Sequence, residues 1–161
     1  MEGFAVYETQ YGPARMDWQD DAITGLQLIT TEKHEELGDG EPNDLTDETF
    51  RQLHEYFEGL LTQFTVPISI VNGTRFQRAV WQQLLSIPYG ETRTYGQIAE
   101  AVGNPKAVRA VGSANNHNPI TFIIPCHRVV GVGGRLVGYA YGTDMKRELL
   151  RMELRVSQQT A

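Results

Sequence analysis

The sequence predicts an α+β fold, with a small N-terminal antiparallel sheet and a covering helix, followed by a mostly helical winged helix-turn-helix-like domain. Short apolar runs separated by turn residues occupy about the first 30 positions, and longer stretches with helical spacing follow. The 161 residues are 40% hydrophobic and 21% charged, which excludes a disordered chain. We expect 1–70 to form a structural domain with an acidic bias and 71–161 to form the domain that carries the function.

Three strands and one helix are expected in the first half. The predicted strands lie within Phe4–Tyr7, Ala14–Trp18 and Ile23–Ile29. The acidic, glycine-bearing stretch 32–43 predicts a loop. Asp47 is a suitable N-cap for a helix whose apolar residues recur at helical spacing and would cover one face of the sheet. Residues 64–73 predict the junction between the halves.

The second half is predicted to be mostly helical. The expected elements are a helix capped by Thr74, a helix over Tyr95–Val102 capped by Thr94, a turn at Gly103-Asn104, and a helix from Pro105 to about Asn115. Two short helices around a glycine turn indicate a helix-turn-helix motif, whose second helix normally meets DNA. Many ordinary helix pairs share this pattern, so the motif alone does not decide the function.

Charge is divided unevenly between the halves. Residues 1–70 carry three basic and fifteen acidic side chains, a balance of −12, whereas residues 71–161 carry eleven basic and five acidic, a balance of +6. Attraction to phosphate depends on the local field, so a basic second half is compatible with nucleic-acid binding despite the net charge of −6. A composition bias without function explains the charges equally well, and both interpretations stay open.

The sequence contains a single cysteine, Cys126, which can form neither an internal disulfide nor a zinc site of several thiolates. We therefore expect a reducing, cytoplasmic location and no metal. No apolar run reaches the roughly 18 residues of a spanning helix, and the start MEGFAVYETQ lacks the pattern of a secretion signal. Neither membrane insertion nor secretion is indicated.

The segment Ile123-Ile124-Pro125-Cys126-His127-Arg128-Val129-Val130 contains the candidate nucleophile. A lone cysteine among apolar residues is usually a small buried hydrophobe. Here a base and a cation follow it directly, and a nucleophilic sulfur needs such neighbours to become a thiolate. Adjacent side chains point in different directions on regular structure, so a proton relay from Cys126 to His127 requires a turn or an intervening water. The glycines after Val130 predict a flexible wing or turn.

With these residues in view, the chain resembles the O6-alkylguanine-DNA alkyltransferases, also called methylated-DNA–protein-cysteine methyltransferases. The resemblance spans residues 73–155 through GTRFQRAVWQQLLSIPYGETRTYGQIAEAVGNPKAVRAVGSANNHNP, IIPCHRVV, VGYAYG and the last helix. It implies that Cys126 takes an alkyl group irreversibly from the O6 of guanine in DNA, and that each molecule acts once. O4-alkylthymine is left open as a second substrate, and no cofactor is implied.

The resemblance also implies catalytic roles. His127 takes the thiol proton through a water, Glu153 orients and charges the imidazole, and Tyr95 donates toward the departing purine. Asn118 holds the turn before the reactive segment. Taken one at a time, Glu153 could be a solvated helix residue, Tyr95 a core residue and Asn118 an ordinary turn residue. Their joint presence at the family's spacing favours the catalytic interpretation.

A guanine stacked in duplex DNA cannot reach a buried thiol, so the nucleotide has to be flipped out. The resemblance assigns Arg109 to the gap in the stack, entered from the minor groove. The implied DNA-binding residues are Tyr95, Lys106, Arg109, Ala110, Gly112, Ser113 and Arg128. The implied substrate-pocket residues are Asn118, Val129, Tyr139 and Ala140. The expected partner is double-stranded DNA bearing O6-alkylguanine; we expect a monomer in solution and leave cooperative binding along DNA open.

Three other classes of protein share part of the pattern. An alkyltransferase-like lesion binder has the fold and the base flipping but lacks the reactive cysteine. A winged-helix transcriptional regulator explains the motif and the charge, but not the Pro-Cys-His-Arg segment. A cysteine hydrolase uses Cys126 and His127 but needs no basic, DNA-facing half.

Overall fold

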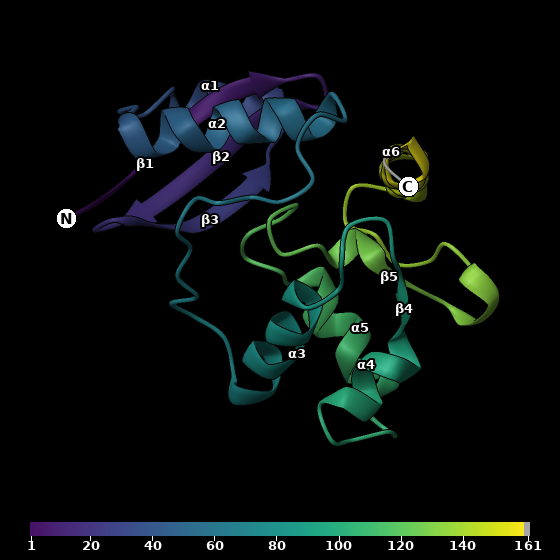
Figure 1. The fold of residues 1–161 in the computed structure, drawn as a ribbon. Helices are drawn as coiled ribbons and strands as arrows, with labels where there is room; N and C mark the ends of the chain where they lie inside the picture. The colour runs from purple at the N-terminus through teal and green to yellow at the C-terminus, as the bar shows by residue number, and fades with distance from the viewer. Residues whose placement is uncertain (160–161) are drawn as a thin grey trace. The chain divides into compact units, whose positions relative to one another are not determined.

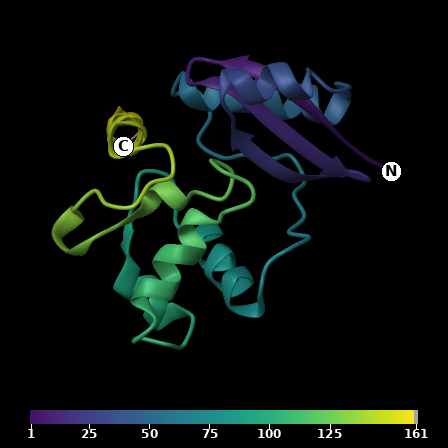
Figure 2. The same ribbon diagram turned by 180° about the vertical axis from the view of Figure 1, so that it is seen from behind.

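The computed structural model describes residues 1–159, which form two compact units (Figures 1 and 2). Unit 1 comprises Met1–Val71 together with Pro119–Thr121, and unit 2 comprises Asn72–Asn118 and the residues from Phe122 onward. The predicted α+β class is confirmed, since unit 1 contains a three-stranded antiparallel sheet and unit 2 is mostly helical. Among the described residues, no helix is both long and apolar enough to cross a membrane.

Unit 1 is built on a sheet and a helix that packs on it. Its strands are β1 (Glu2–Thr9), β2 (Gly12–Gln19) and β3 (Ala22–Leu28), paired antiparallel in that order. Side chains alternate between the two faces of a strand, and Ala5, Met16 and Leu26 are fully buried. Helix α2 (Asp44–Phe57) lies along the sheet (Figure 1), where the rings of Tyr7 and Phe50 stack with centroids 4.7 Å apart.

Two details of unit 1 differ from the sequence prediction. The stretch 32–43, expected to be a loop, contains most of helix α1 (Thr31–Leu37), which has no buried residue and so lacks an apolar periodicity. Helix α2 begins at Asp44 rather than after Asp47, because Asn43 and Thr46 form a reciprocal capping box. Hydrogen bonds at the caps therefore set where both helices start.

Three residues of the second half belong to unit 1. The Leu26 N–H donates to Pro119 O at 3.0 Å, and the Thr121 N–H donates to Leu26 O at 3.0 Å. Ile120 thus forms an isolated parallel bridge with Leu26 of β3. A single domain boundary near residue 70 leaves out residues 119–121, which pair with β3 of unit 1 although they are far from it in sequence.

Unit 2 surrounds the reactive segment with short helices. Its elements are α3 (Arg75–Leu85), β4 (Arg93–Thr94), α4 (Tyr95–Ala101), α5 (Val108–Asn116), the 3₁₀ turn η1 (Cys126–Arg128), β5 (Val129–Val130), the 3₁₀ turn η2 (Val132–Gly134) and α6 (Thr143–Gln159). Thr74 and Thr94 cap α3 and α4 as predicted, each in a capping box. The Trp81 Nε1–H donates to Ala114 O at 2.8 Å and ties α3 to the end of α5.

For unit 2, the predicted start of α5 is wrong, and the segment predicted to be a wing or a turn is a turn. Helix α5 starts at Val108 rather than at Pro105, because the Ala107 N–H first closes a turn onto Asn104 O at 3.0 Å. Lys106 therefore lies in the turn before α5. The glycine-rich segment after β5, expected to be a wing or a turn, forms the turn η2, in which Gly133 has a φ of 71°.

Candidate active site

Cys126 is the first residue of η1, and only 6% of it is exposed. The backbone turns tightly before it, where the Cys126 N–H donates to Ile124 O at 2.8 Å. Two asparagine side chains brace this turn. Asn118 Nδ2 donates to Ile124 O at 2.7 Å, and Asn115 Nδ2 donates to Cys126 O at 3.2 Å. The carbonyls of Ile124 and Cys126 are therefore held by side chains from the end of α5 and just beyond it.

His127 is fully buried and contacts Glu153 of α6, with Nε2 and Oε2 2.6 Å apart. Burial would raise the pKa of Glu153, but hydrogen bonds and charge from His127 and Arg128 lower that pKa to about 2. An ionised carboxylate only accepts, so Nε2 donates and Nδ1 is the nitrogen that can take up a proton. Burial lowers the pKa of His127 below its ordinary value despite the opposing effect of Glu153, so the imidazole is neutral at pH 7.

Arg128, which the sequence analysis expected at DNA, belongs to the same network. Its guanidinium donates to Glu153 from Nε at 2.8 Å and from Nη2 at 3.1 Å. Nη1 donates to Ile87 O at 2.8 Å, and the group lies over the ring of Tyr89. The residue is buried, and its charge balances the carboxylate. The Gly90 N–H also donates to Glu153 Oε1, at 3.0 Å.

Tyr95 and Lys146 share one backbone acceptor. The Tyr95 hydroxyl donates to Val137 O at 3.0 Å, and Lys146 Nζ donates to the same oxygen at 2.9 Å. Lys146 Nζ also lies 5.7 Å from the centroid of the Tyr95 ring. The start of α4 and the first turns of α6 therefore meet at the loop that precedes α6.

Lys146 is fully buried, and its charge is one of the influences on the pKa of the Cys126 thiol. Burial lowers the pKa of Lys146 to about 8, while the charge of Cys126 opposes this decrease. Burial also raises the pKa of the Cys126 thiol, whereas a hydrogen bond from Asn118 and the charge of Lys146 lower it. Burial and the nearby Cys126 raise the pKa of Tyr95, so its hydroxyl keeps its proton at neutral pH.

Helix α5 has two distinct faces. Buried on one face are Val111, Ala114 and Asn115, while Arg109, Ala110 and Ser113 are exposed and Gly112 is partly exposed. Ala110, Gly112 and Ser113 are small and lie beside the long cation Arg109, so another molecule's backbone can approach this part of the helix closely. The predicted DNA-facing residues of α5 therefore point outward, and the opposite face supports the turn at Cys126.

The predicted pocket residues after Cys126 differ in exposure. Val129 is fully buried in β5, whereas Tyr139 is buried in the loop before α6 and Ala140 is exposed. The ring of Tyr139 packs edge-on against that of Tyr141, with centroids 5.7 Å apart. The segment that the sequence assigned to substrate thus places a buried tyrosine, Tyr139, and a partly exposed one, Tyr141, on either side of the exposed Ala140.

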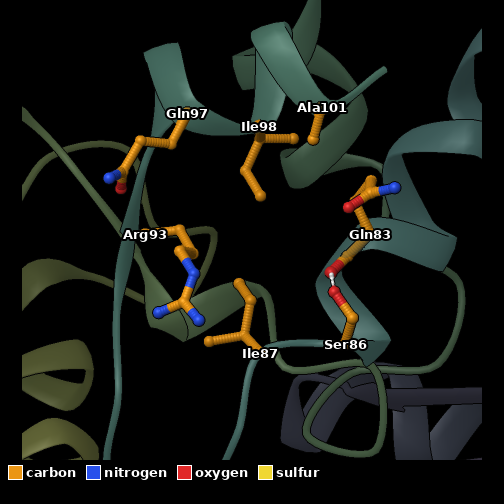
Figure 3. A pocket seen from close by; sticks show the side chains of 7 residues that line it. All are labelled: Gln83, Ser86, Ile87, Arg93, Gln97, Ile98 and Ala101. Carbon is orange, nitrogen blue, oxygen red and sulfur yellow. Dashed lines mark hydrogen bonds between the residues drawn. The ribbon is translucent and has the colours of Figure 1, made fainter.

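A separate hollow of about 210 Å³ lies between α3, β4 and α4 (Figure 3). It is lined by Gln83, Ser86, Ile87, Arg93, Gln97, Ile98 and Ala101. None of these is a predicted site residue. Ile87 connects the hollow to the active-site network, because its carbonyl accepts from Arg128.

Known proteins are similar to this chain over most of its length. The model of the 6-O-methylguanine DNA methyltransferase DNA-binding domain matches residues 75–155. A methylated-DNA–protein-cysteine methyltransferase of Methanosarcina acetivorans is 46% identical over 152 residues, covering 93% of this chain and 97% of the relative. The chain belongs to the methylated-DNA–protein-cysteine methyltransferase family. Another family member, from Mycobacterium leprae, is 46% identical over 147 residues, 91% of this chain and 88% of the relative.

Solved structures of this methyltransferase family have the same fold. The O6-methylguanine methyltransferase of Mycobacterium tuberculosis matches with a TM-score of 0.83 and 42% identity, covering 96% of this chain and 94% of that one. The same organism's protein in complex with DNA matches with a TM-score of 0.80 and 40% identity, covering 95% and 93%. The family resemblance stated from the sequence is thereby confirmed.

Two residues near the thiol of this family member were not predicted from the sequence, Lys146 and Asn115. Both lie on the buried stripe of an amphipathic helix. Lys146 precedes Leu149 by three positions and Glu153 by seven on α6, and Asn115 follows Val111 by four on α5. A polar side chain on such a stripe needs a buried partner, and this signal in the sequence could have identified both.

Proposed function

We propose that this protein repairs DNA by transferring the alkyl group of O6-alkylguanine irreversibly to Sγ of Cys126, one group per molecule. The supporting observation is a buried thiol followed directly by the His127–Glu153 pair in a chain of this family. Sγ bonds to the alkyl carbon as the carbon–O6 bond breaks, and in the net reaction the thiol proton goes to the released guanine. An imidazole and a carboxylate do not cleave a thioether, so the protein is consumed.

The proposed proton path runs through His127. Since Nε2 is bonded to the Glu153 carboxylate, Nδ1 is the basic nitrogen, and a water between Sγ and Nδ1 carries the proton. Burial keeps the imidazole neutral and therefore basic at neutral pH, and Glu153 stabilises the imidazolium that forms. The Tyr95 hydroxyl exchanges Val137 O for the purine and donates to it as it leaves.

DNA is the proposed partner, and α5 is the element that meets it. The damaged base is extruded into the site, and Arg109 enters the stack in its place. Ala110, Gly112 and Ser113 allow a close approach to the backbone of the duplex. Lys106, in the turn before α5, neutralises phosphate. The charge balance of +6 in residues 71–161 and the DNA complex of the M. tuberculosis relative support this assignment.

Further parts of the proposal concern organisation and substrate range. Residues 1–70 act as a structural domain, and 71–161 bind DNA and transfer the alkyl group. The protein works as a monomer, and cooperative binding along DNA is a separate question for titration. O4-alkylthymine has the same kind of alkyl–oxygen bond and is the second lesion to test. A cytoplasmic location fits a protein whose thiol has to stay reduced.

Stoichiometry tests the proposed function directly. With an excess of duplex DNA containing O6-methylguanine, each molecule is expected to gain about one methyl group and then stop, because the thioether is not regenerated. Intact-mass spectrometry measures the gain, and peptide mapping locates it on Cys126. The control Cys126→Ser is expected to bind the same DNA without gaining mass. Sustained turnover, or a methyl group on another residue, would refute the assignment.

Lys146 is proposed to stabilise the thiolate, and Lys146→Met tests this role. Below its pKa of about 8, Lys146 is protonated, so removing it is expected to slow single-turnover transfer at pH 7 about tenfold. The midpoint of the pH–rate profile should also rise. The difference in transfer rate between Lys146→Met and wild type should shrink above pH 8, where Lys146 loses its own proton.

The control for this comparison is Arg147→Met, because Arg147 is exposed on the same helix. It is expected to leave both the rate and the profile unchanged. A wild-type profile for Lys146→Met would instead restrict Lys146 to holding the Val137 carbonyl.

A further inference from the structure

We infer that Asn115 is a positioning residue for Cys126, through which helix α5 controls where the thiol points. The inference rests on the proposed alkyl transfer and concerns how the nucleophile is held, not how it is ionised. It is carried by one buried hydrogen bond, by the orientation that this bond imposes on the amide, and by the place of Asn115 on α5.

The hydrogen bond acts on the residue that carries the sulfur. Asn115 is 1% exposed, and its Nδ2 donates to Cys126 O at 3.2 Å. Only the nitrogen end of an amide can face a carbonyl oxygen, so the orientation of the side chain is determined. The Val129 N–H donates to the same carbonyl and closes η1. Two donors thus fix the plane of the peptide that follows the Cys126 Cα, and with it the direction of the side chain.

The oxygen end of the amide, Oδ1, shows that keeping the Nδ2 donor at this position lowers the stability of the fold. Asn115 Oδ1 is buried and has no hydrogen-bond partner within residues 1–159. A buried acceptor without a partner destabilises a fold, and a leucine of similar size would avoid that loss. Asparagine is therefore explained here by what Nδ2 does and not by packing.

The position of Asn115 connects the turn at the thiol to the proposed DNA-binding face. Arg109 lies six positions earlier on the same helix and is exposed. Next to Asn115, Ala114 O accepts from Trp81 Nε1 at 2.8 Å, which anchors this end of α5 to α3. Asn118 also braces the reactive segment, but it lies beyond the end of the helix. Asn115 is thus the side chain on α5 itself that transmits the helix position to Cys126.

Asn115→Leu removes the donor and keeps the size of the side chain. We expect single-turnover transfer to Cys126 to fall about tenfold, both from duplex DNA containing O6-methylguanine and from free O6-benzylguanine. Alkylation of the thiol by iodoacetamide should stay within about twofold of wild type, and the midpoint of the pH–rate profile should not move, because ionisation is unaffected. Affinity for DNA should also stay within about twofold. Asn116→Leu, exposed at the next position, is the matched control and should transfer at the wild-type rate.

Asn115→Ala provides a second test if the leucine variant folds poorly, since it removes the same donor without adding a branched side chain. Wild-type transfer rates in the folded variants would overturn the inference. A parallel loss of iodoacetamide reactivity would also overturn it, since Asn115 would then govern the ionisation or access of the thiol. If wild-type protein itself gained no alkyl mass from the damaged DNA, the proposed function would fail first, and the positioning role would fall with it.

Discussion

Arg109→Ala is expected to slow the repair of O6-methylguanine in duplex DNA on the order of 100-fold. Unstacking a base costs a few kcal/mol, and each 1.4 kcal/mol that the enzyme does not recover is about a factor of ten in rate. Arg109 is exposed on α5 among small residues, where it can replace the extruded base. Single-turnover rates on duplex DNA measure the loss.

Measuring the reaction with the free modified base separates a role of Arg109 in base extrusion from a general loss of transfer activity. Free O6-alkylguanine needs no extrusion, so Arg109→Ala should keep much of its reaction with it. Lys106→Ala is the matched comparison, because Lys106 lies in the turn just before α5 and is proposed to contact phosphate. Its effect should be weaker binding with a smaller salt dependence. Equal losses on duplex DNA and on the free base, or a wild-type rate on the duplex, would exclude intercalation by Arg109.

Glu153→Gln is expected to lower both the stability of the protein and the rate of transfer. Glu153 holds a buried guanidinium, that of Arg128, besides the imidazole of His127. Removing one partner of a buried ion pair costs about 3–5 kcal/mol, because the other charge is left uncompensated. Transfer should slow strongly in the folded variant, since the imidazolium loses its counter-charge, while affinity for DNA stays within a few-fold.

Denaturant unfolding as a function of pH tests the stability effect. The folded-state pKa of Glu153, about 2, lies below the ordinary 4.5, so its contribution is fully present above pH 4.5 and is lost as the pH falls toward 2. The difference in unfolding free energy between wild type and Glu153→Gln should therefore decrease as the pH falls from 4.5 toward 2. Glu148→Gln, at an exposed position of α6, should change the unfolding free energy by less than about 0.5 kcal/mol. A Glu153→Gln variant of wild-type stability and rate would remove Glu153 from both roles.

The sequence alone determined the features that depend on local patterns. Apolar periodicity and cap residues predicted the three strands, the covering helix and the helices capped by Thr74 and Thr94, because these elements are encoded within a few residues. The segment Pro-Cys-His-Arg and its flanking motifs were specific enough to indicate the family. Helix α1 was not predicted, because none of its residues is buried and its sequence therefore carries no apolar stripe.

Only the tertiary structure decided the environment of the thiol, because it depends on contacts between residues distant in sequence. Arg128 follows the nucleophile by two positions, yet its charge is directed to Glu153, 25 residues away. The buried stripes of α6 and α5 indicate that Lys146 and Asn115 need buried partners, but only the fold shows that these partners are Val137 O and Cys126 O. Burial then sets their chemistry, since a polar group removed from water must find a partner or change its protonation state.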